Sequence, residues 1–269
     1  MSDARPIGVF DSGVGGLTVA AALARALPGE SILYLGDTAR LPYGTKSEQT
    51  VARYTRTNVD FLVGRGVKAV VVACNTASAL ALPHLAPSLP VWGVIEPGAR
   101  RAAQVSAGRV GVIATESTVH SGAYERALRA QRADLDVRSQ ACPLLVPLVE
   151  EGWFDDPITV EVLSRYLAPL LAAAIDTLVL GCTHYPLLVP ALRRVVGERI
   201  ALVDSAEAVA ADVARDLERL GLRSEHREGA DHVCVTDSAE RFTRLAREIL
   251  HRPVRLELVD LGDGGGGER

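Results

Sequence analysis

Short apolar runs rich in valine, isoleucine and leucine alternate along the chain with longer amphipathic stretches. The runs have the length and β-branched character of buried strands, whereas the amphipathic stretches repeat their apolar residues with a helical period. This alternation favours βαβ units, so we expect an α/β fold with mainly parallel sheets flanked by helices. The expected strands lie near 6–10, 31–36, 68–73, 91–95, 109–114, 136–141, 176–180, 200–203, 231–236 and 254–258, and the expected helices include 14–26, 49–64, 159–173, 206–220 and 239–250.

Two of the apolar runs end in a cysteine that is followed by hydrogen-bonding side chains. Cys74 ends the run that starts at Val70, and Cys182 ends the run that starts at Thr177. In open α/β sheets, ligands bind beyond the carboxyl ends of such strands. Two thiols facing one substrate suggest a reaction that needs a base on one side and an acid on the other.

A weak internal repeat relates the two cysteine segments. Cys74 lies 66 positions after Gly8 of one Gly-Val strand, and Cys182 lies 71 positions after Gly111 of another. Chance is the alternative explanation, because Gly-Val pairs are common. Two similar α/β lobes would bring both cysteines to a cleft between them. We expect a first lobe of residues 1–96 plus about 205–260, a second lobe of 97–204 with the break at Glu96-Pro97-Gly98, and a glycine-rich, disordered tail of 261–269.

The composition excludes several classes of function. The net charge is −4 and no basic stripe is visible, so we expect no nucleic-acid partner. No apolar run reaches the length of about 18 residues that a membrane span needs. The first residues lead directly into a strand without a signal-peptide pattern, and the four cysteines lack the spacing of a disulfide framework. We therefore expect a cytoplasmic protein with free thiols.

The scarcity of lysine argues against one cofactor in particular. Only Lys46 and Lys68 are lysines among the 29 basic residues. Pyridoxal phosphate chemistry needs a lysine in the site. Lys68 stands at the wrong end of its strand and Lys46 in a polar helix start, so we expect no such cofactor.

Two glycine-containing loops follow the first two strands. The glycines of 11–16 would let backbone amides approach an anion, whereas the carboxylate of Asp11 suits a substrate ammonium or a nearby thiol. A simple strand-to-helix turn is the alternative. The loop 36–44 is restricted by Pro42 and Gly44, and it is either a surface loop or a substrate wall that presents Tyr43 and the Gly44 amide.

Each cysteine allows several interpretations from the residues alone. A buried structural cysteine is common, and two Cys with one His could ligate zinc, although no Cys-x-x-Cys spacing supports a metal. A lone nucleophilic cysteine with His184 as its base would leave the second thiol without a role. Cys142 and Cys234 lack polar neighbours of this kind, so we expect them to be structural. The carboxylates at 150–151 are either a solvated helix end or part of a site.

The motifs taken together resemble the glutamate racemases, cofactor-independent members of the aspartate/glutamate racemase superfamily. The resemblance covers residues 7 to about 205 in the family's order and spacing, and beyond that only general helical character agrees. A small departure is Ala114, where the family is expected to have glycine. The segments that carry the resemblance are 8–16, 36–44, 73–78, 93–97, 118–124, 142–143, 147–150 and 181–187.

The resemblance implies a role for each motif residue. Cys74 and Cys182 resemble the two acid/base cysteines, Asp11 the carboxylate beside the first thiol, and Glu150 and His184 the auxiliary groups near the second. It also implies that D-glutamate is supplied for peptidoglycan precursors, with no metal and no cofactor. A homodimer is left open, because family members differ in assembly. The residues that match the family's substrate-binding positions are Asp11, Ser12, Tyr43, Gly44, Asn75, Thr76, Thr118, Thr183 and His184.

The residues fit a racemisation in which one thiolate removes the α-proton and a thiol on the opposite face returns one. A free thiol has a pKa of about 8.5, so a thiol that serves as a base needs help. Asp11 and His184 could relay protons at the two ends. The rival functions are an aspartate racemase or another dicarboxylate isomerase of the superfamily, and a non-enzymatic two-lobed protein that binds a small ligand.

Overall fold

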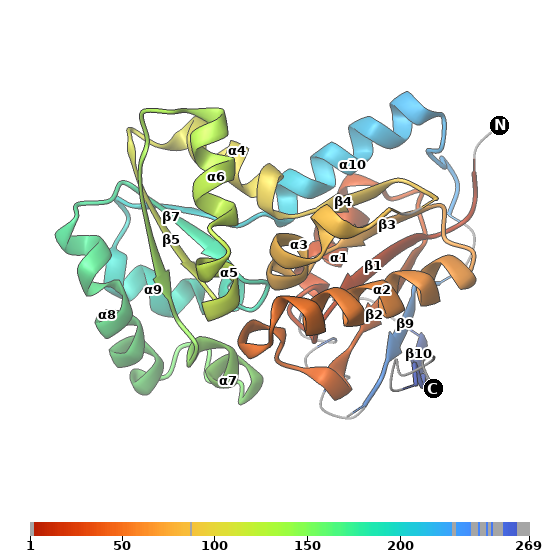
Figure 1. Cartoon of the computed structure of the whole chain (residues 1–269), viewed down its shortest axis with the longest axis horizontal. Helices are drawn as coiled ribbons and strands as arrows, with labels where there is room; N and C mark the ends of the chain where they lie inside the picture. Colours follow the sequence, from red (N-terminus) through yellow and green to blue (C-terminus); the bar gives the residue numbers. More distant parts are fainter. Residues whose placement is uncertain are drawn as a thin grey trace.

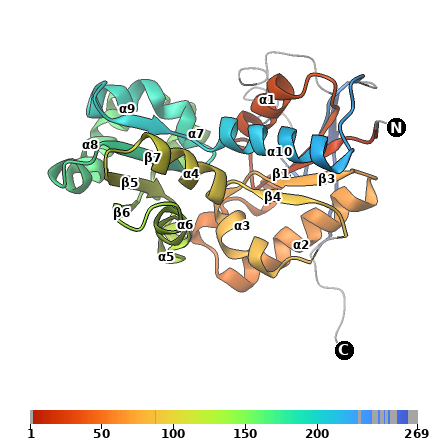
Figure 2. The same ribbon diagram turned by 90° about the horizontal axis from the view of Figure 1, so that it is seen from above.

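The computed structural model describes residues 3–86, 88–227, 230–237, 242, 246, 249 and 255–262, and it contains two parallel sheets. Figure 1 shows the sheets in separate halves of the molecule, and Figure 2 shows the same arrangement from above. The first sheet has the order β10-β9-β2-β1-β3-β4 and the second β6-β5-β7-β8. Their strands are β1 (Ile7–Asp11), β2 (Ile32–Gly36), β3 (Ala69–Val72), β4 (Val91–Gly93), β5 (Arg109–Ala114), β6 (Asp136–Ala141), β7 (Thr177–Gly181), β8 (Ala201–Val203), β9 (His232–Val235) and β10 (Arg255–Leu258).

Each of the ten predicted strand runs overlaps a strand of these sheets, with β1 and β7 ending one residue later than predicted, and the α/β fold class is confirmed. The central strands β1, β2, β3 and β7 are buried along their whole length, which explains their nearly continuous apolar sequence. The edge strand β6 is only partly or not buried, and most of its residues are polar.

Helices cover both sheets, and three of the described α-helices start with a side-chain cap. Ser47 caps α2 by accepting from the Thr50 N–H, and Asp156 caps α8, where Pro157 takes the first helical position. Thr115 caps α5 by accepting from the Thr118 N–H, and most of the other α-helices bury an apolar face. The helices are α1 (Leu17–Ala26), α2 (Glu48–Gly64), α3 (Asn75–Leu80), α4 (Ile95–Val105), α5 (Glu116–His120), α6 (Ala123–Gln131), α7 (Leu145–Glu150), α8 (Pro157–Ala172), α9 (Val189–Val196) and α10 (Ala206–Leu220), with short 3₁₀ turns η1 (Thr38–Arg40), η2 (Tyr43–Thr45), η3 (Leu82–His84) and η4 (Tyr185–Leu188).

The helix expected over 14–26 begins only at Leu17. Residues 14–16 instead complete the turn after β1, where the backbone approaches Asp11 closely. The helix expected over 239–250 and the tail at 263–269 lie outside the described residues, apart from single positions of the former. Within the described part of the chain, no helix combines the length and the apolar character that crossing a membrane requires.

The two sheets share a topology. The order β2-β1-β3-β4 in the first sheet corresponds to β6-β5-β7-β8 in the second, and all these pairs are parallel. Cys74 follows β3 and Cys182 follows β7, so the thiols occupy corresponding positions. In each sheet, the cysteine strand neighbours the first strand of the repeat, which is the switch point where open sheets bind ligands.

The chain passes from the first sheet to the second through α4, and Glu96-Pro97-Gly98 lie in the first turn of this helix. After β8, α10 returns to pack on α1, and its apolar face joins the core beneath β1 and β3. α3 of the first half contacts α5 of the second, close to the carboxyl ends of the strands (Figure 1). The lobe limits stay predictions, although this path is compatible with them.

Candidate active site

Cys74 and Asp11 lie on adjacent strand ends. The Ala73 N–H donates to the Phe10 carbonyl at 2.8 Å, which extends the β1–β3 ladder to the residues just before these two side chains. Cys74 then forms the N-cap position of α3. The pairing of two neighbouring parallel strands therefore places a thiol beside a carboxylate.

The surroundings of Cys74 favour its protonated form. Burial raises the pKa of the Cys74 thiol to about 12, and the negative charges of Asp11 and Cys182 add to the increase. The hydroxyl of Ser12 lies 3.6 Å from Sγ and can accept the thiol proton. The Thr183 hydroxyl, next to Cys182 in the chain, donates to Asp11, so the loops that carry the two thiols meet across the two halves.

Asp11 is fully buried and touches both halves of the molecule. It accepts from the Gly13 N–H at 2.9 Å and from the Thr183 hydroxyl at 3.2 Å. Burial raises its pKa, although His184 and these hydrogen bonds act in the opposite direction. A Cβ atom at Gly16 would lie 2.4 Å from the Asp11 Cβ, so glycine is required at this turn. The raised pKa makes this carboxylate a stronger base than an ordinary aspartate.

Cys182 lies at the start of a linear relay with His184 and Glu150. His184 Nδ1 is 3.8 Å from Cys182 Sγ, and Nε2 is 2.7 Å from the Glu150 carboxylate at the end of α7. Burial alone would lower the pKa of His184, but hydrogen bonds to Cys182 and Glu150 raise it well above its ordinary value. An imidazolium here donates to both neighbours and stabilises negative charge on the Cys182 sulfur.

Three threonine hydroxyls meet where α3 and α5 contact. Thr76 Oγ1 lies 2.9 Å from Thr115 Oγ1 and 3.2 Å from Thr118 Oγ1, and the latter two are 2.9 Å apart. Thr76 comes from the first half, while the other two begin α5 in the second. All three are buried, so the cluster presents hydroxyls from both halves at one point.

The 36–44 loop reaches the second half at the same place. Ser117 donates to the Gly44 carbonyl at 2.8 Å, and a Cβ at Gly44 would lie 2.4 Å from the Thr115 Cβ. The Tyr43 hydroxyl, in contrast, is bound by Asp37 and Asn58 within the first half. The hydrogen bonds of the Tyr43 side chain therefore fix the loop within the first half.

Known proteins resemble this chain in both sequence and architecture. The chain matches the family described as Asp/Glu/Hydantoin racemase over residues 8–213. It is 52% identical to a glutamate racemase of Geobacter metallireducens over 251 residues, which are 91% of this chain and 93% of the relative.

The chain belongs to the glutamate racemase family. A glutamate racemase structure from Bacillus anthracis has a TM-score of 0.92 and 42% identity, covering 96% of this chain and 98% of that one. A Francisella tularensis glutamate racemase, solved in complex with D-glutamate, has a TM-score of 0.90 and 35% identity, covering 96% of this chain and 98% of that one.

The structure brings the residues suggested by the racemase motifs together at one junction. All of them except Glu150, which ends α7, lie on the segments after β1, β2, β3, β5 and β7, which converge from both sheets. Sequence reasoning missed Thr115, Asp37 and Tyr124 as contributors. Thr115 directly follows β5 as Ser12 directly follows β1, and this correspondence between the two repeats is the signal that identifies it.

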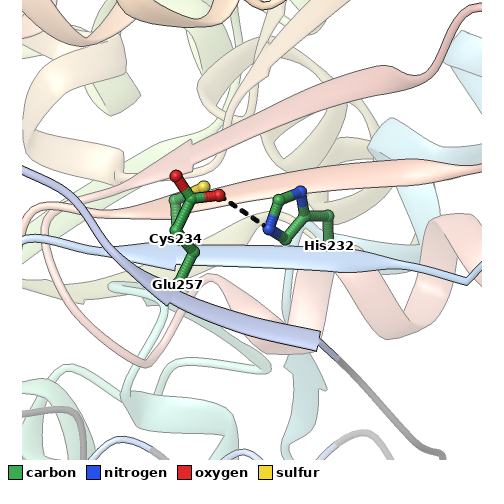
Figure 3. A group of neighbouring side chains, drawn as sticks. All are labelled: His232, Cys234 and Glu257. Atoms are coloured by element: carbon green, nitrogen blue, oxygen red, sulfur yellow. Dashed lines mark ion pairs between the residues drawn. The ribbon is translucent and has the colours of Figure 1, made fainter.

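The remaining two cysteines make different contacts. Cys142 Sγ is buried, 3.5 Å from the Gln140 carbonyl, in the core of the second half. Cys234 is buried on β9, where its thiol lies within 4.8 Å of donor atoms of His232 and Glu257 (Figure 3).

The donor types of the Cys234 cluster would suit zinc, but Arg65 binds both Glu257 oxygens, at 2.7 and 3.2 Å. A cation would have to displace this guanidinium from the carboxylate. His232 also contacts the same carboxylate, at 2.9 Å. We therefore interpret the cluster as an ion-pair network that attaches β10 to β9 and α2, and we assign no metal to it.

Proposed function

We propose that this protein interconverts L-glutamate and D-glutamate by a two-thiol acid–base mechanism that needs no cofactor. The observation that carries the proposal is the pair of cysteines at corresponding strand ends of two similar sheets. Each thiol has a different group beside it that can hold a proton: Asp11 at one and His184 at the other.

In the direction from L- to D-glutamate, the Cys182 thiolate removes the α-proton and becomes a thiol. The His184 imidazolium stabilises that thiolate before the transfer. The Cys74 thiol then donates its proton to the opposite face of the planar carbanion and becomes a thiolate. The high pKa of Cys74 keeps this proton available at the start. The free enzyme is restored when protons return to Cys74 and leave Cys182.

In the reverse direction, Cys74 must first lose its proton. Asp11 is the nearby group suited to accept it, because its raised pKa makes it a stronger base than an ordinary aspartate. A fixed carboxylate charge alone would hinder thiolate formation, since like charges repel. We therefore assign Asp11 a proton-accepting or ammonium-pairing role, and not the stabilisation of a Cys74 thiolate.

The substrate's charged groups can be held by the hydroxyls and amides at the junction. Ser12 and Asn75 flank Cys74, and Thr183 flanks Cys182 in the corresponding position. Thr76 and Thr118 present the shared hydroxyl cluster, and the backbone of Tyr43–Gly44 closes one side. In this proposal, these donors bind the substrate carboxylates and stabilise the negative charge of the carbanion without a metal.

The choice of glutamate rests on the relatives, several of which are glutamate racemases by name, one of them with D-glutamate bound. The alternative is an aspartate racemase or a related dicarboxylate isomerase, because the shared thiol chemistry does not depend on side-chain length. A purely ligand-binding protein would have no use for two thiols and their proton relays. We further propose a cytoplasmic role in providing D-glutamate for peptidoglycan precursors, which the free state of the four thiols supports.

The test is incubation of the purified chain with either enantiomer of glutamate or aspartate, followed by chiral chromatography. We expect each glutamate enantiomer to approach an equal mixture, with and without a chelator, and aspartate to convert far more slowly. The Cys74→Ser/Cys182→Ser variant is the matched control for contaminating activity. Loss of activity on chelation, an absorption band of pyridoxal in the active protein, or faster turnover of aspartate would overturn the proposal.

A further inference from the structure

Tyr124 touches both thiol loops, although it lies on neither. Its hydroxyl donates to Asn75 Oδ1 at 2.6 Å, and Asn75 is the residue after Cys74. Its ring packs against Gly181, the residue before Cys182, where an added Cβ would lie 3.0 Å from Cε2 of the ring. α6 of the second half therefore supplies one side chain that reaches both cysteines' neighbours.

This hydrogen bond determines which end of the Asn75 amide is free. An asparagine amide has a carbonyl end that accepts and an NH₂ end that donates. Because Tyr124 occupies the carbonyl oxygen, the NH₂ group of Asn75 is turned away from α6. An NH₂ donor suits a carboxylate, whereas an exposed carbonyl oxygen would repel one.

The environment of Tyr124 supports a fixed donor. Its side chain is 1% exposed, and burial raises its pKa, so the hydroxyl stays protonated. Ser205, at the start of α10 where the chain returns to the first half, also hydrogen-bonds to the phenol. Gly98 of α4 lies beside the same hydroxyl. Tyr124 is therefore held where both crossings between the halves meet.

We propose that Tyr124 is a positioning residue that orients the Asn75 amide toward a substrate carboxylate and fixes the two thiol loops relative to each other. It touches neither thiol through any contact described here, so it acts through Asn75 and Gly181. The inference rests on the proposed racemase function, because it assumes that Asn75 contacts the substrate.

The test is a double-mutant cycle of Tyr124→Phe and Asn75→Ala. Without the phenol, the Asn75 amide loses its fixed orientation, so KM for both enantiomers should rise about tenfold, the order expected for one hydrogen bond to a charged group. kcat should change less than KM. If Tyr124 acts through Asn75, the double variant should bind no more weakly than Asn75→Ala alone.

Binding should also be measured by calorimetry with D-glutamate in the Cys74→Ser/Cys182→Ser background, which does not turn substrate over. Tyr166→Phe is the matched control, because Tyr166 also lies in the second half, on α8, and its hydroxyl accepts from the Leu144 N–H at 3.4 Å outside the junction. It should lower the melting temperature and leave KM within about twofold, since one backbone-directed hydrogen bond is lost away from the substrate.

Two failures are distinguishable. The positioning role would be overturned, in a chain that still racemises glutamate, if the two substitutions weaken binding additively. It would also be overturned if Tyr124→Phe lowers kcat equally for both enantiomers and leaves KM unchanged. A wild-type chain that neither binds nor racemises glutamate would overturn the proposed function and this inference together.

Discussion

The two thiol sites occupy corresponding positions in similar sheets, yet their chemical surroundings differ. Cys74 lies beside a buried carboxyl and a hydroxyl, and its pKa is raised to about 12. Cys182 faces a histidine that is paired with Glu150 and whose pKa is raised well above its usual range. One end therefore holds a proton on sulfur, while the other holds it on nitrogen.

This difference suits a reaction that must run in both directions. In the proposed mechanism, Cys182 takes the α-proton of L-glutamate beside the His184–Glu150 pair, and Cys74 supplies the proton from the opposite face. In the reverse direction of that mechanism, Asp11 takes the proton from Cys74. The topology of the sheets supplies two equivalent places for a thiol, and the loops around them supply the different proton-holding groups.

The largest effect is expected when either thiol is replaced. Cys74→Ser and Cys182→Ser should each reduce racemisation by at least about 10³-fold, because a serine hydroxyl is a much poorer base and each face needs its own group. Chiral assays from both enantiomers measure this loss.

Cys142→Ser and Cys234→Ser are the matched controls, and each should retain most of the activity. A folded but inactive Cys234→Ser variant would show that the thiols are wrongly assigned.

Replacing the auxiliary groups should reveal the asymmetry. Asp11→Asn should lower turnover of D-glutamate more than that of L-glutamate, and His184→Asn should show the opposite bias. Assistance of this kind contributes about 10²–10⁴ in rate, so the losses should be large but incomplete.

The equilibrium constant between enantiomers is one, so kcat/KM must stay equal in the two directions. The bias should therefore appear in kcat and KM separately. Equal losses of kcat in both directions would indicate that these groups only bind the substrate.

The strands and the junction were predictable because their signals are local. Continuous β-branched runs identify β1, β3 and β7, and polar residues directly after them identify Asp11, Cys74 and Cys182. Once the family resemblance was stated, Glu150 and His184 followed from motif positions, and the structure places them 2.7 Å apart.

The structural role of Tyr43 and the contacts of Tyr124 were not predictable. Nothing in the sequence near Tyr43 indicates that Asp37 and Asn58 bind its hydroxyl, because Asn58 comes from the following helix. Tyr124 reaches Asn75 across 49 positions of sequence and between two halves of the molecule. Such pairings depend on how the sheets face each other, which periodicity does not encode.

The two thiols should also differ in chemical reactivity. Their exposed fractions are 5% and 6%, so access alone does not distinguish them. With a pKa of about 12, roughly one Cys74 in ten thousand is a thiolate at about pH 8. Iodoacetamide should therefore label Cys182 first, as measured by peptide mass spectrometry, and saturating D-glutamate should slow the labelling. Faster labelling of Cys74 would reverse the assignment of the two ends.

A smaller effect is expected in the pH dependence of stability. The pKa of His184 is raised in the folded protein, so its contribution is fully present below the unfolded value of about 6.5 and is lost as pH rises through the folded pKa. Urea unfolding of the wild type should show this decline above about pH 6.5, and His184→Asn should show less of it. An identical pH profile for both proteins would mean that His184 is not held as an imidazolium.

The most direct test of two thiols on opposite faces is racemisation of protiated L-glutamate in deuterated water, stopped at low conversion. Chiral separation and mass spectrometry then give the isotope at Cα of each enantiomer. The account predicts D-glutamate that carries solvent deuterium and remaining L-glutamate that retains protium, because the proton removed by Cys182 is not the one delivered by Cys74. Protium retained in the D-product, or deuterium entering recovered L-glutamate as fast as product forms, would show that a single group serves both faces.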